Sequence, residues 1–538
     1  MKTLIRGGTL YDGTGAASVE ADVLIDGDRI AAIGKDIPDR AYTKTIDAHG
    51  RVVTPGFVDV HRHADAAAFL FSAFGMTELA QGITTTAVGN CGIAPVPYTN
   101  PQWQEEMYRY IEPVIGPVPL TEEVKLPFKD YHHYTAGLKK RALPINMAFL
   151  AGAGAIKNAV KGFAKTPFTP NEMARATAFV QEAMEAGALG LSFGIMYQPE
   201  CYSTRAELSA LAKPAGIAGG VLCTHIRGEG DSLVDSVREM IEVAEAARIP
   251  LNISHFKATG IKNWRSLIFR AIDAIEDARA KGQPVTADFY PYDGGSTTLL
   301  SLIPPSVLED TTTALFIKLA TPAGKTVLRR ELYKPQPRWD NMVASIGWDR
   351  IIVSSVTLPQ HNNCCGKSLA DIAQEQGYSD SADLVCDLLI SEEGRVGIIV
   401  LSMAQEDIDE IARLPWTALI SDSLYGGGAH PHPRLNGAFP KFLREYVRER
   451  KVLTMEQAIH KMTAIPAKHL GITERGALKP GYYADVLVFD PQQFTDHADY
   501  LHPMEHATGM NTVILNGTIV RSNGVGSSTA GRPVFRSK

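Results

Sequence analysis

The chain is poor in cysteine, with six in 538 residues. So few thiols in so long a chain do not make the dense disulfide framework of a small secreted protein, and we expect them to be reduced. The N-terminal segment 1–8 reaches glycine before an apolar core of signal-peptide length has formed. These two features predict a cytoplasmic protein.

Long apolar runs and dense runs of positive charge are also missing. No apolar stretch reaches the roughly 18 residues that a membrane-spanning helix needs, so we expect no membrane partner. The formal net charge is −6, and Lys and Arg do not gather in runs, which argues against a nucleic-acid partner. With 45% hydrophobic and 21% charged residues, the composition is ordinary for a soluble globular protein. It leaves a homo-oligomer open.

The two ends of the chain resemble each other in pattern. Residues 1–54 and 476–538 contain short apolar runs separated by Gly and Asp turn signals. Asn516-Gly517, between two such runs, is a strong β-hairpin signal. Two β-rich ends around a different middle predict one small β-sandwich domain assembled from both termini.

The middle of the chain, residues 55–475, alternates apolar strands with amphipathic helices, which is typical of an α/β fold. Helical spacing is clear over 171–186 and 231–247. The candidate strands are 57–61, 83–89, 146–150, 189–193, 221–225, 251–255, 285–289, 396–402 and 418–422. Because a (β/α)8 TIM-like barrel needs eight strands, we expect one of the nine to belong to an excursion, placed at about 294–395. A second insertion is expected at about 94–130, an irregular, proline-rich stretch.

The most informative pattern is the histidine pair that ends the first candidate strand. His61 and His63 stand at alternate positions, so both side chains can point to the same face of an extended strand. By itself this pattern is also found in ordinary solvated strand ends.

Metal-binding residue types recur at the ends of other candidate strands. They are Cys91, His225, His255 and Asp422. In a β/α barrel, the carboxyl ends of the strands form one ring around the active-site mouth, so these distant residues become neighbours. The combined nitrogen, sulfur and oxygen donors suit Zn²⁺.

Several motifs of this chain resemble those of the N-acyl-D-amino-acid deacylases, or D-aminoacylases, of the amidohydrolase superfamily. They are His61-Arg62-His63-Ala64-Asp65, Gly89-Asn90-Cys91-Gly92, Ala188-Leu189-Gly190-Leu191-Ser192, Thr224-His225-Ile226-Arg227-Gly228-Glu229, Ile253-Ser254-His255-Phe256-Lys257, Tyr290-Pro291-Tyr292 and Pro431-His432-Pro433-Arg434. The tail 476–490 resembles the superfamily's return to its β-domain. The segment around Cys91 best distinguishes this family within the superfamily, because many superfamily members use a carboxylated lysine as the bridging metal ligand. No lysine ends the strand 189–193 in this chain.

The resemblance implies a metal assignment and a reaction. Cys91, His225 and His255 would hold one tight Zn²⁺, while His61, His63 and Asp422 would frame a second, weaker position that Cys91 can bridge. One or two bound metals are both compatible with it. The implied reaction is hydrolysis of the amide bond of N-acyl-D-amino acids, which releases a D-amino acid and a carboxylate. Metal-activated water would be the nucleophile and Asp422 the proton shuttle, the alternative for Asp422 being a pure metal ligand.

Such a substrate carries a carboxylate, which calls for a cation in the pocket. Lys257 would share a strand face with His255, and the resemblance supports it as a substrate ligand, with Tyr290 or Tyr292 as hydroxyl donors. The further candidates for the substrate pocket are Arg434, Arg227, Tyr197 and Ser296. A structural salt bridge is the alternative role for Arg227, and aromatic packing is the alternative for Tyr197.

The chain departs from the family pattern at several positions: Arg62, Ala153, Phe193 and Ser423. None is a predicted metal ligand, so these departures bear on substrate preference and not on hydrolysis itself. His430 and His432 are expected to shape a loop after the last strand.

Two other functions are compatible with parts of this pattern. A cyclic-amide hydrolase of the hydantoinase or dihydroorotase type would share the barrel and the metal, but it would be expected to use the missing carboxylated lysine. A non-catalytic amidohydrolase-like scaffold would be expected to have lost ligands, whereas all six candidates are present.

Overall fold

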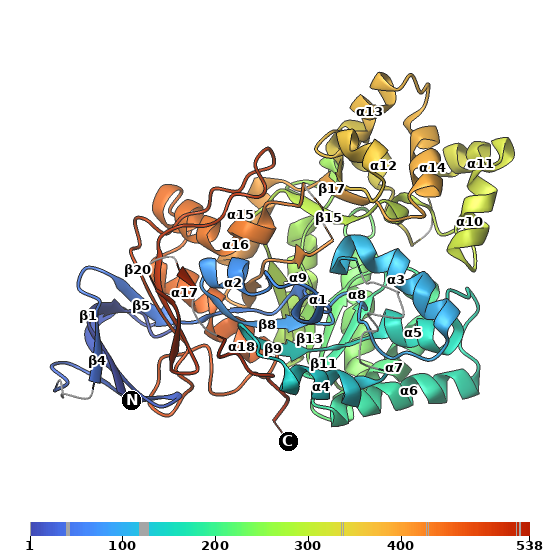
Figure 1. The fold of residues 1–538 in the computed structure, drawn as a ribbon. Helices are drawn as coiled ribbons and strands as arrows, with labels where there is room; N and C mark the ends of the chain where they lie inside the picture. The colour runs from blue at the N-terminus through green and yellow to red at the C-terminus, as the bar shows by residue number, and fades with distance from the viewer. Residues whose placement is uncertain are drawn as a thin grey trace.

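The computed structural model describes residues 2–38, 43–117, 129–334, 336, 338–426, 428, 430–522, 525–526 and 529–537. Figure 1 shows the strands from both chain ends on one side of a barrel and the yellow helices of an inserted segment on the other. In the described part of the chain, no helix is both long enough and apolar enough to cross a bilayer.

The two chain ends build one mixed sheet. Its strands are β1 (Lys2–Leu10), β2 (Val19–Asp26), β3 (Arg29–Gly34), β4 (Thr43–Asp47), β5 (Val52–Pro55), β20 (Val486–Phe489), β21 (Met510–Leu515), β22 (Thr518–Ser522) and β23 (Val525–Gly526). Their order is β23-β22-β21-β20-β5-β1-β2-β3, with β4 paired to β1. The N-terminal and C-terminal strands meet where β5 pairs antiparallel with β20.

The predicted hairpin is confirmed at β21–β22. Its turn residues Asn516 and Gly517 have φ values of 47° and 77°. A type I′ turn requires positive φ at both central residues, which Asn and Gly tolerate best.

Eight parallel strands in the described residues form the barrel, which confirms the predicted fold class. They are β6 (Phe57–Asp59), β8 (Ile83–Val88), β9 (Asn146–Phe149), β11 (Gly190–Gly194), β12 (Val221–His225), β13 (Leu251–Ile253), β14 (Val285–Phe289) and β18 (Thr417–Leu419). The short β10 (Ala151–Gly152) continues from β9 and pairs with β11. The ring closes where β19 (Ser423–Leu424) pairs with β7 (Arg62–His63). The last and first strand ends therefore lie next to each other.

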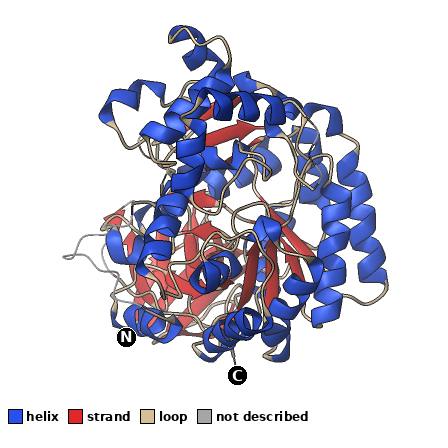
Figure 2. Cartoon of the chain, turned by 90° about the vertical axis from the view of Figure 1, so that its right-hand side faces the viewer, coloured by secondary structure: helices blue, strands red, loops and turns tan. Residues whose placement is uncertain are grey.

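Helices cover the outside of the barrel, as Figure 2 shows. They include α4 (Tyr131–Lys140), α5 (Ala153–Lys161), α6 (Pro170–Glu185), α7 (Arg205–Ile217), α8 (Leu233–Ala247), α9 (Leu267–Ala280), α15 (Gln405–Arg413), α16 (Arg434–Lys441), α17 (Met455–Met462) and α18 (Ala464–His469). Shorter elements are α1 (Ala67–Leu70), α2 (Met76–Ala80) and the 3₁₀ turns η1 (Glu200–Tyr202) and η2 (Ile261–Asn263). A π-helix, η6 (Phe442–Glu449), follows α16 directly. The helical spacing over 171–186 and 231–247 corresponds to α6 and α8.

The ninth candidate strand, 396–402, lies outside the barrel. As β17 (Gly397–Leu401) it pairs antiparallel with β15 (Gly294–Thr298) and β16 (Ile351–Ser355) in a separate sheet. The inserted helices are α10 (Thr312–Leu319), α11 (Pro322–Leu332), α12 (Met342–Ile346), α13 (Leu369–Glu375) and α14 (Ser381–Ser391), with turns η3 (Leu299–Leu302), η4 (Trp348–Arg350) and η5 (Pro359–Cys364). The excursion therefore runs past 395, because this strand completes its sheet.

The expected irregular stretch 94–130 contains a helix, α3 (Pro101–Ile115), so that expectation was wrong there. The Asn100 side chain caps the helix by accepting from the amides of Gln102 and Trp103. Pro101 occupies the first helical position, where its fixed φ favours the helix. Residues 118–128 of the stretch lie outside the described residues.

One buried ring joins the barrel to the terminal sheet. Phe57 of β6 has no exposed surface. Its centroid lies 5.7 Å from that of Phe439 and 6.3 Å from those of Phe489, in β20, and Phe494. The two parts of the molecule therefore share one apolar core.

Phe57→Ala should lower the free energy of unfolding by about 3–5 kcal/mol, because it removes a buried ring and leaves a cavity. Urea denaturation followed by tryptophan fluorescence measures this loss. Ile217→Ala, at an exposed helix end, is the control and should change stability by less than about 0.5 kcal/mol. Similar losses in both variants would contradict the shared core.

Candidate metal centre and active site

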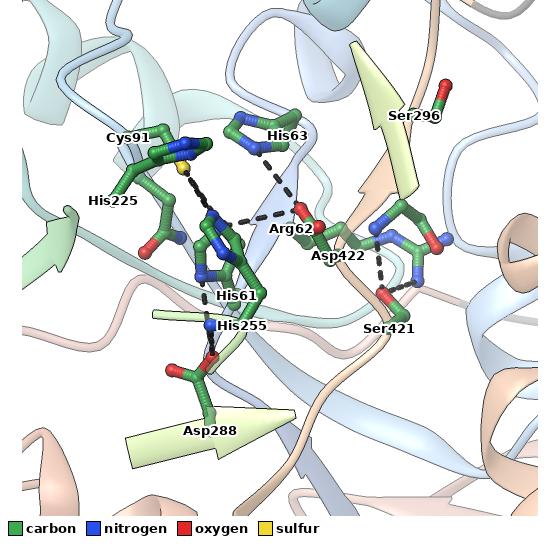
Figure 3. A network of polar contacts seen from close by, with 12 residues as sticks. His61, Arg62, His63, Cys91, His225, His255, Asp288, Ser296, Ser421 and Asp422 are labelled. Carbon is green, nitrogen blue, oxygen red and sulfur yellow. Dashed lines mark hydrogen bonds and ion pairs between the residues drawn. The ribbon is translucent and has the colours of Figure 1, made fainter. Parts of the chain in front are cut away.

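The six predicted metal ligands converge at the carboxyl ends of the barrel strands (Figure 3). Three overlapping groups have donor atoms within 4.8 Å of one another: His61–His63–Cys91, Cys91–His225–His255 and His61–His255–Asp422. All six residues are buried. The ring of strand ends thus brings together residues that are far apart in the sequence.

The separations between these donors suit a shared cation. Cys91 Sγ lies 3.3 Å from His61 Nε2 and 3.4 Å from His255 Nε2. Asp422 Oδ1 lies 3.4 Å from His61 Nε2 and 3.5 Å from His63 Nε2. Donors about 2.0–2.3 Å from one tetrahedral zinc ion stand at such separations from each other.

Several buried nitrogen atoms at the site have no protein partner. Both ring nitrogens of His225, and Nδ1 of His61 and of His63, make no hydrogen bond with the described residues. Burial lowers the pKa of His61 well below its ordinary value and that of His225 to about 3. Neutral imidazoles with free nitrogens are metal ligands, so the residues fit a divalent cation.

The Cys91 side chain is presented by a strained turn. Cys91 has a φ of 53°, between Gly89 at 81° and Gly92 at 71°. Ser192 of β11 holds both ends of this turn: its hydroxyl donates to the Gly89 carbonyl and accepts from the Gly92 amide at 3.0 Å. Asp65 accepts from the Gly89 amide at 2.6 Å. Burial raises the pKa of the Cys91 thiol, so a thiolate here depends on a nearby cation.

His255 is held by a carboxylate on the neighbouring strand, a residue that the sequence analysis missed. The His255 backbone has a φ of 36°, and its amide donates to Asp288 Oδ1 at 2.5 Å. Asn252 donates to the other oxygen of Asp288 at 2.6 Å. Burial raises the pKa of Asp288 to about 7. Its place at the end of the candidate strand 285–289 was the available signal.

Asp422 is positioned from both sides. Its backbone has a φ of 50°, and its amide donates to the His61 carbonyl at 2.9 Å. Arg434 Nη1 lies 2.8 Å from Asp422 Oδ2. Burial alone would raise the pKa of this carboxyl, but Arg434 and His61 hold it well below its ordinary value. Asp422 is therefore ionised.

Arg62, a departure from the family pattern, points away from the metal ligands on either side of it. Its guanidinium lies 3.1 Å from Glu78, 3.3 Å from Asp59 and 3.2 Å from the Ser421 hydroxyl. It does not line the cavity beside the ligands, so a direct influence of Arg62 on the substrate is not supported. It instead links the His61–His63 strand end to the residue before Asp422.

Glu229 is a second residue that the sequence analysis missed. Its Oε1 accepts from Lys257 Nζ at 2.6 Å and lies 2.9 Å from His255 Nδ1. Lys257 Nζ also lies 2.7 Å from His255 Nδ1. Glu229 stands four residues after His225, in a motif used above only for the resemblance. This short spacing could have indicated that Glu229 lies near the metal ligands. Lys257 is thus tied to a metal ligand as well as facing the cavity.

A cavity adjoins the ligand cluster, and five of the seven predicted substrate residues line it: Lys257, Tyr290, Tyr197, Ser296 and Arg227. Ser296 stands apart from the metal ligands in Figure 3 and donates to the Ile398 carbonyl at 3.0 Å. The Tyr197 hydroxyl lies 3.0 Å from that of Thr297. Arg227 binds Glu239 through two nitrogens, at 2.9 and 3.0 Å, so its alternative role as a structural ion pair is the one that the geometry favours.

The other two substrate candidates do not line this cavity. Tyr292 lines a different hollow, beside Asp293 and Tyr500. Arg434 lies over the Tyr290 ring, 4.7 Å from its centroid, and pairs with Asp422. Arg434 still contacts two residues of the cavity wall, Asp422 and the Ser296 carbonyl. The roles of Tyr292 and Arg434 as substrate ligands stay predictions.

His430 and His432 lie apart from the metal ligands. His432 Nε2 contacts the Gly294 carbonyl and His430 Nε2 contacts the Tyr500 carbonyl, both at 2.9 Å. These contacts agree with the expected role of shaping a loop.

Comparison with known proteins places the chain in a family. The sequence profile of the amidohydrolase family matches residues 44–324 and 388–521. The chain belongs to this family, among the N-acyl-D-amino-acid deacylases. It is 33% identical to a D-aminoacylase from Alcaligenes xylosoxydans xylosoxydans, over 96% of this chain and 94% of that protein. It is also 33% identical to an N-acyl-D-glutamate deacylase of the same organism, over 99% and 96%.

A solved structure agrees with this family membership. The N-acyl-D-glutamate deacylase from Bordetella bronchiseptica, complexed with zinc and a phosphonate inhibitor that mimics the tetrahedral intermediate of its reaction, has a TM-score of 0.82 and 32% identity, with 99% of each chain covered. The segment 325–387, which the family profile leaves unmatched, lies within the insertion that carries α12 to α14.

Ser192→Ala should weaken metal binding about 10–100-fold, as loss of a residue that orients a ligand typically does. The variant releases the turn that presents Cys91. Chelator competition measures the affinity, and the sulfur-to-metal absorption band of the Co²⁺-substituted protein reports the Cys91 geometry.

Ser301→Ala is the matched control, since the Ser301 hydroxyl is also buried and donates to a backbone carbonyl, that of Thr298. It should leave both readouts at the wild-type level. An unchanged affinity and band in Ser192→Ala would show that the Cys91 turn does not need this hydroxyl.

Proposed function

We propose that this chain catalyses zinc-dependent hydrolysis of the amide bond of N-acyl-D-amino acids. The observation that carries the proposal is the convergence of six donor side chains beside a cavity that also contains a lysine. The relatives named above, a D-aminoacylase and two N-acyl-D-glutamate deacylases, support the substrate class.

Cys91, His225 and His255 would hold the tight zinc ion, and His61, His63 and Asp422 would frame a weaker second position. Zinc bound here would supply Lewis acidity, which activates water and polarises a carbonyl. The uncharged imidazoles of His61 and His225 are suited to metal binding without losing a proton first.

Asp422 would move the proton. Its carboxylate, kept ionised by Arg434, would accept a proton from the attacking water and return it to the leaving nitrogen. An amine leaves poorly unless it is protonated, so one carboxylate on the cavity wall serves both halves of the reaction.

Lys257 would receive the substrate carboxylate. Its ammonium lines the cavity, with Glu229 Oε1 at 2.6 Å and His255 Nδ1 at 2.7 Å, which leaves at least one of its three N–H donors for a substrate oxygen. Tyr290, Tyr197 and Ser296 would complete the polar part of the pocket from three separate elements.

The deciding experiment compares substrates with the zinc-loaded protein. Release of amino acid from N-acetyl-D-methionine, with the L-enantiomer much slower, supports the proposal. Faster opening of hydantoin or dihydrouracil would instead favour the cyclic-amide hydrolase. An absence of turnover on every amide would favour a non-catalytic scaffold.

Asp422→Ala should lose kcat by about 10²–10⁴-fold, the range for removal of a general base, while keeping zinc at the tight position. Metal analysis of the purified variant checks the second point. Asp422→Asn, which keeps the shape without the charge, should lose a similar factor. Near-native kcat in either variant would rule out the proton shuttle.

The compartment and the assembly also stay predictions. All six cysteines are free, which supports the expected reducing cytoplasm. The net charge of −6 supports the expected absence of a nucleic-acid partner, and the composition leaves a homo-oligomer open.

A further inference from the structure

Apolar side chains from two parts of the chain line the active-site cavity. Ile93, Val114 and Leu424 come from segments after the early strands and at the ring closure. Trp339, Met342 and Val400 come from the insertion, which also contributes Ser296, Thr297, Asp340 and Ser345. The metal ligands and Lys257 lie on the polar part of the same cavity. An N-acyl amino acid presents two groups beside its amide, the acyl chain and the side chain, and both would meet apolar walls here.

The cations of the cavity wall are already paired. Among the described lining residues, Arg227 binds Glu239 with two nitrogens and donates to the carbonyls of Cys201 and Ser203, each at 2.9 Å. Lys257 is paired with Glu229 and is the cation assigned above to the substrate's α-carboxylate.

Three carboxylates also line the cavity. Glu229 is paired with Lys257 and Asp422 with Arg434, and Asp340 is the third. Asp340, brought in by the insertion, accepts from the Gly230 amide at 2.6 Å and from the Ser232 amide at 3.1 Å. The second carboxylate of a substrate such as N-acyl-D-glutamate would face apolar or acidic side chains. Among the described lining residues, no cation is free to pair with it. An unpaired charge in such a site strongly disfavours binding.

Part of this wall comes from the insertion. Trp339, Met342 and Asp340 lie in 325–387, the segment that the family profile does not match. The relatives named for different side chains, D-aminoacylase and N-acyl-D-glutamate deacylase, are equally identical to this chain. Overall identity therefore does not select between them, whereas the cavity wall does.

We infer that this chain selects N-acyl-D-amino acids with uncharged, apolar side chains of the methionine, leucine and phenylalanine class, and discriminates against N-acyl-D-glutamate and N-acyl-D-aspartate. The selection arises from the apolar wall of Trp339, Met342 and Val400 and from the paired state of Arg227. This inference rests on the proposed deacylase function and adds its side-chain specificity.

The test measures kcat/KM for N-acetyl derivatives of D-leucine, D-methionine, D-glutamine and D-glutamate. D-Leucine and D-methionine should exceed D-glutamate by about a hundredfold or more, since the site leaves a buried charge unpaired. D-Glutamine has the size of D-glutamate without its charge, and it should be the better substrate of the two. A kcat/KM for the D-glutamate substrate equal to or above that for D-glutamine would overturn the selectivity. An absence of turnover on all D-substrates would overturn the deacylase function itself.

Met342→Lys adds a cation to this wall at a partly exposed position. The kcat/KM for the D-glutamine substrate divided by that for the D-glutamate substrate should fall at least about fivefold, because the new ammonium can pair with the second carboxylate. Met342→Gln, of similar length and uncharged, is the control and should leave the ratio unchanged. An unchanged ratio in the lysine variant, with circular dichroism confirming its fold, would overturn the assignment of Met342 to the side-chain wall.

Discussion

The metal centre depends on backbone that is held in an unfavourable conformation. Cys91, His255 and Asp422 all have φ between 36° and 53°, a region that non-glycine residues rarely occupy and that persists only where the surroundings fix it. Hydrogen bonds supply that fixation at each residue: Ser192 and Asp65 around Cys91, Asp288 to His255, and the His61 carbonyl to Asp422. Since these partners come from other strands, the ligand geometry exists only after the barrel has closed.

The electrostatics of the site follow from the same closure. Burial keeps the imidazoles of His61 and His225 neutral, while Arg434 keeps the Asp422 carboxylate charged. The carboxyl ends of the strands therefore present two kinds of donor to a bound cation, uncharged nitrogen atoms and a charged oxygen. The insertion adds a different property, because its β15–β17 sheet and α12 bring apolar side chains and Asp340 to the mouth of the cavity. In the proposed reaction, the barrel would supply the catalytic groups, and the insertion would supply part of the pocket for the substrate side chain.

Much of this arrangement could be predicted from sequence, for a geometric reason. A strand of alternating or continuous apolar residues that ends in His, Cys or Asp marks its own carboxyl end, and a barrel places all such ends together. The residues that hold the ligands were harder to find. Ser192 and Asp288 lie within strands, and their hydrogen bonds reach residues that are distant in sequence. The direction of Arg62 depended on Glu78 and Asp59 being buried beside it, which the local pattern does not reveal. Strand 396–402 is as apolar as a barrel strand, so only its antiparallel partners assign it to the insertion.

The pairing of β5 with β20 has a consequence for how the protein is made. On the ribosome, β5 emerges early, but its antiparallel partner follows some 430 residues later. At about 5–20 residues per second, this interval is roughly 20–90 s. During that time the edge of β5 offers unpaired backbone groups, the kind of edge that templates association with other chains. Because the termini are joined, this edge of the terminal sheet stays unpaired until the last strands have been made.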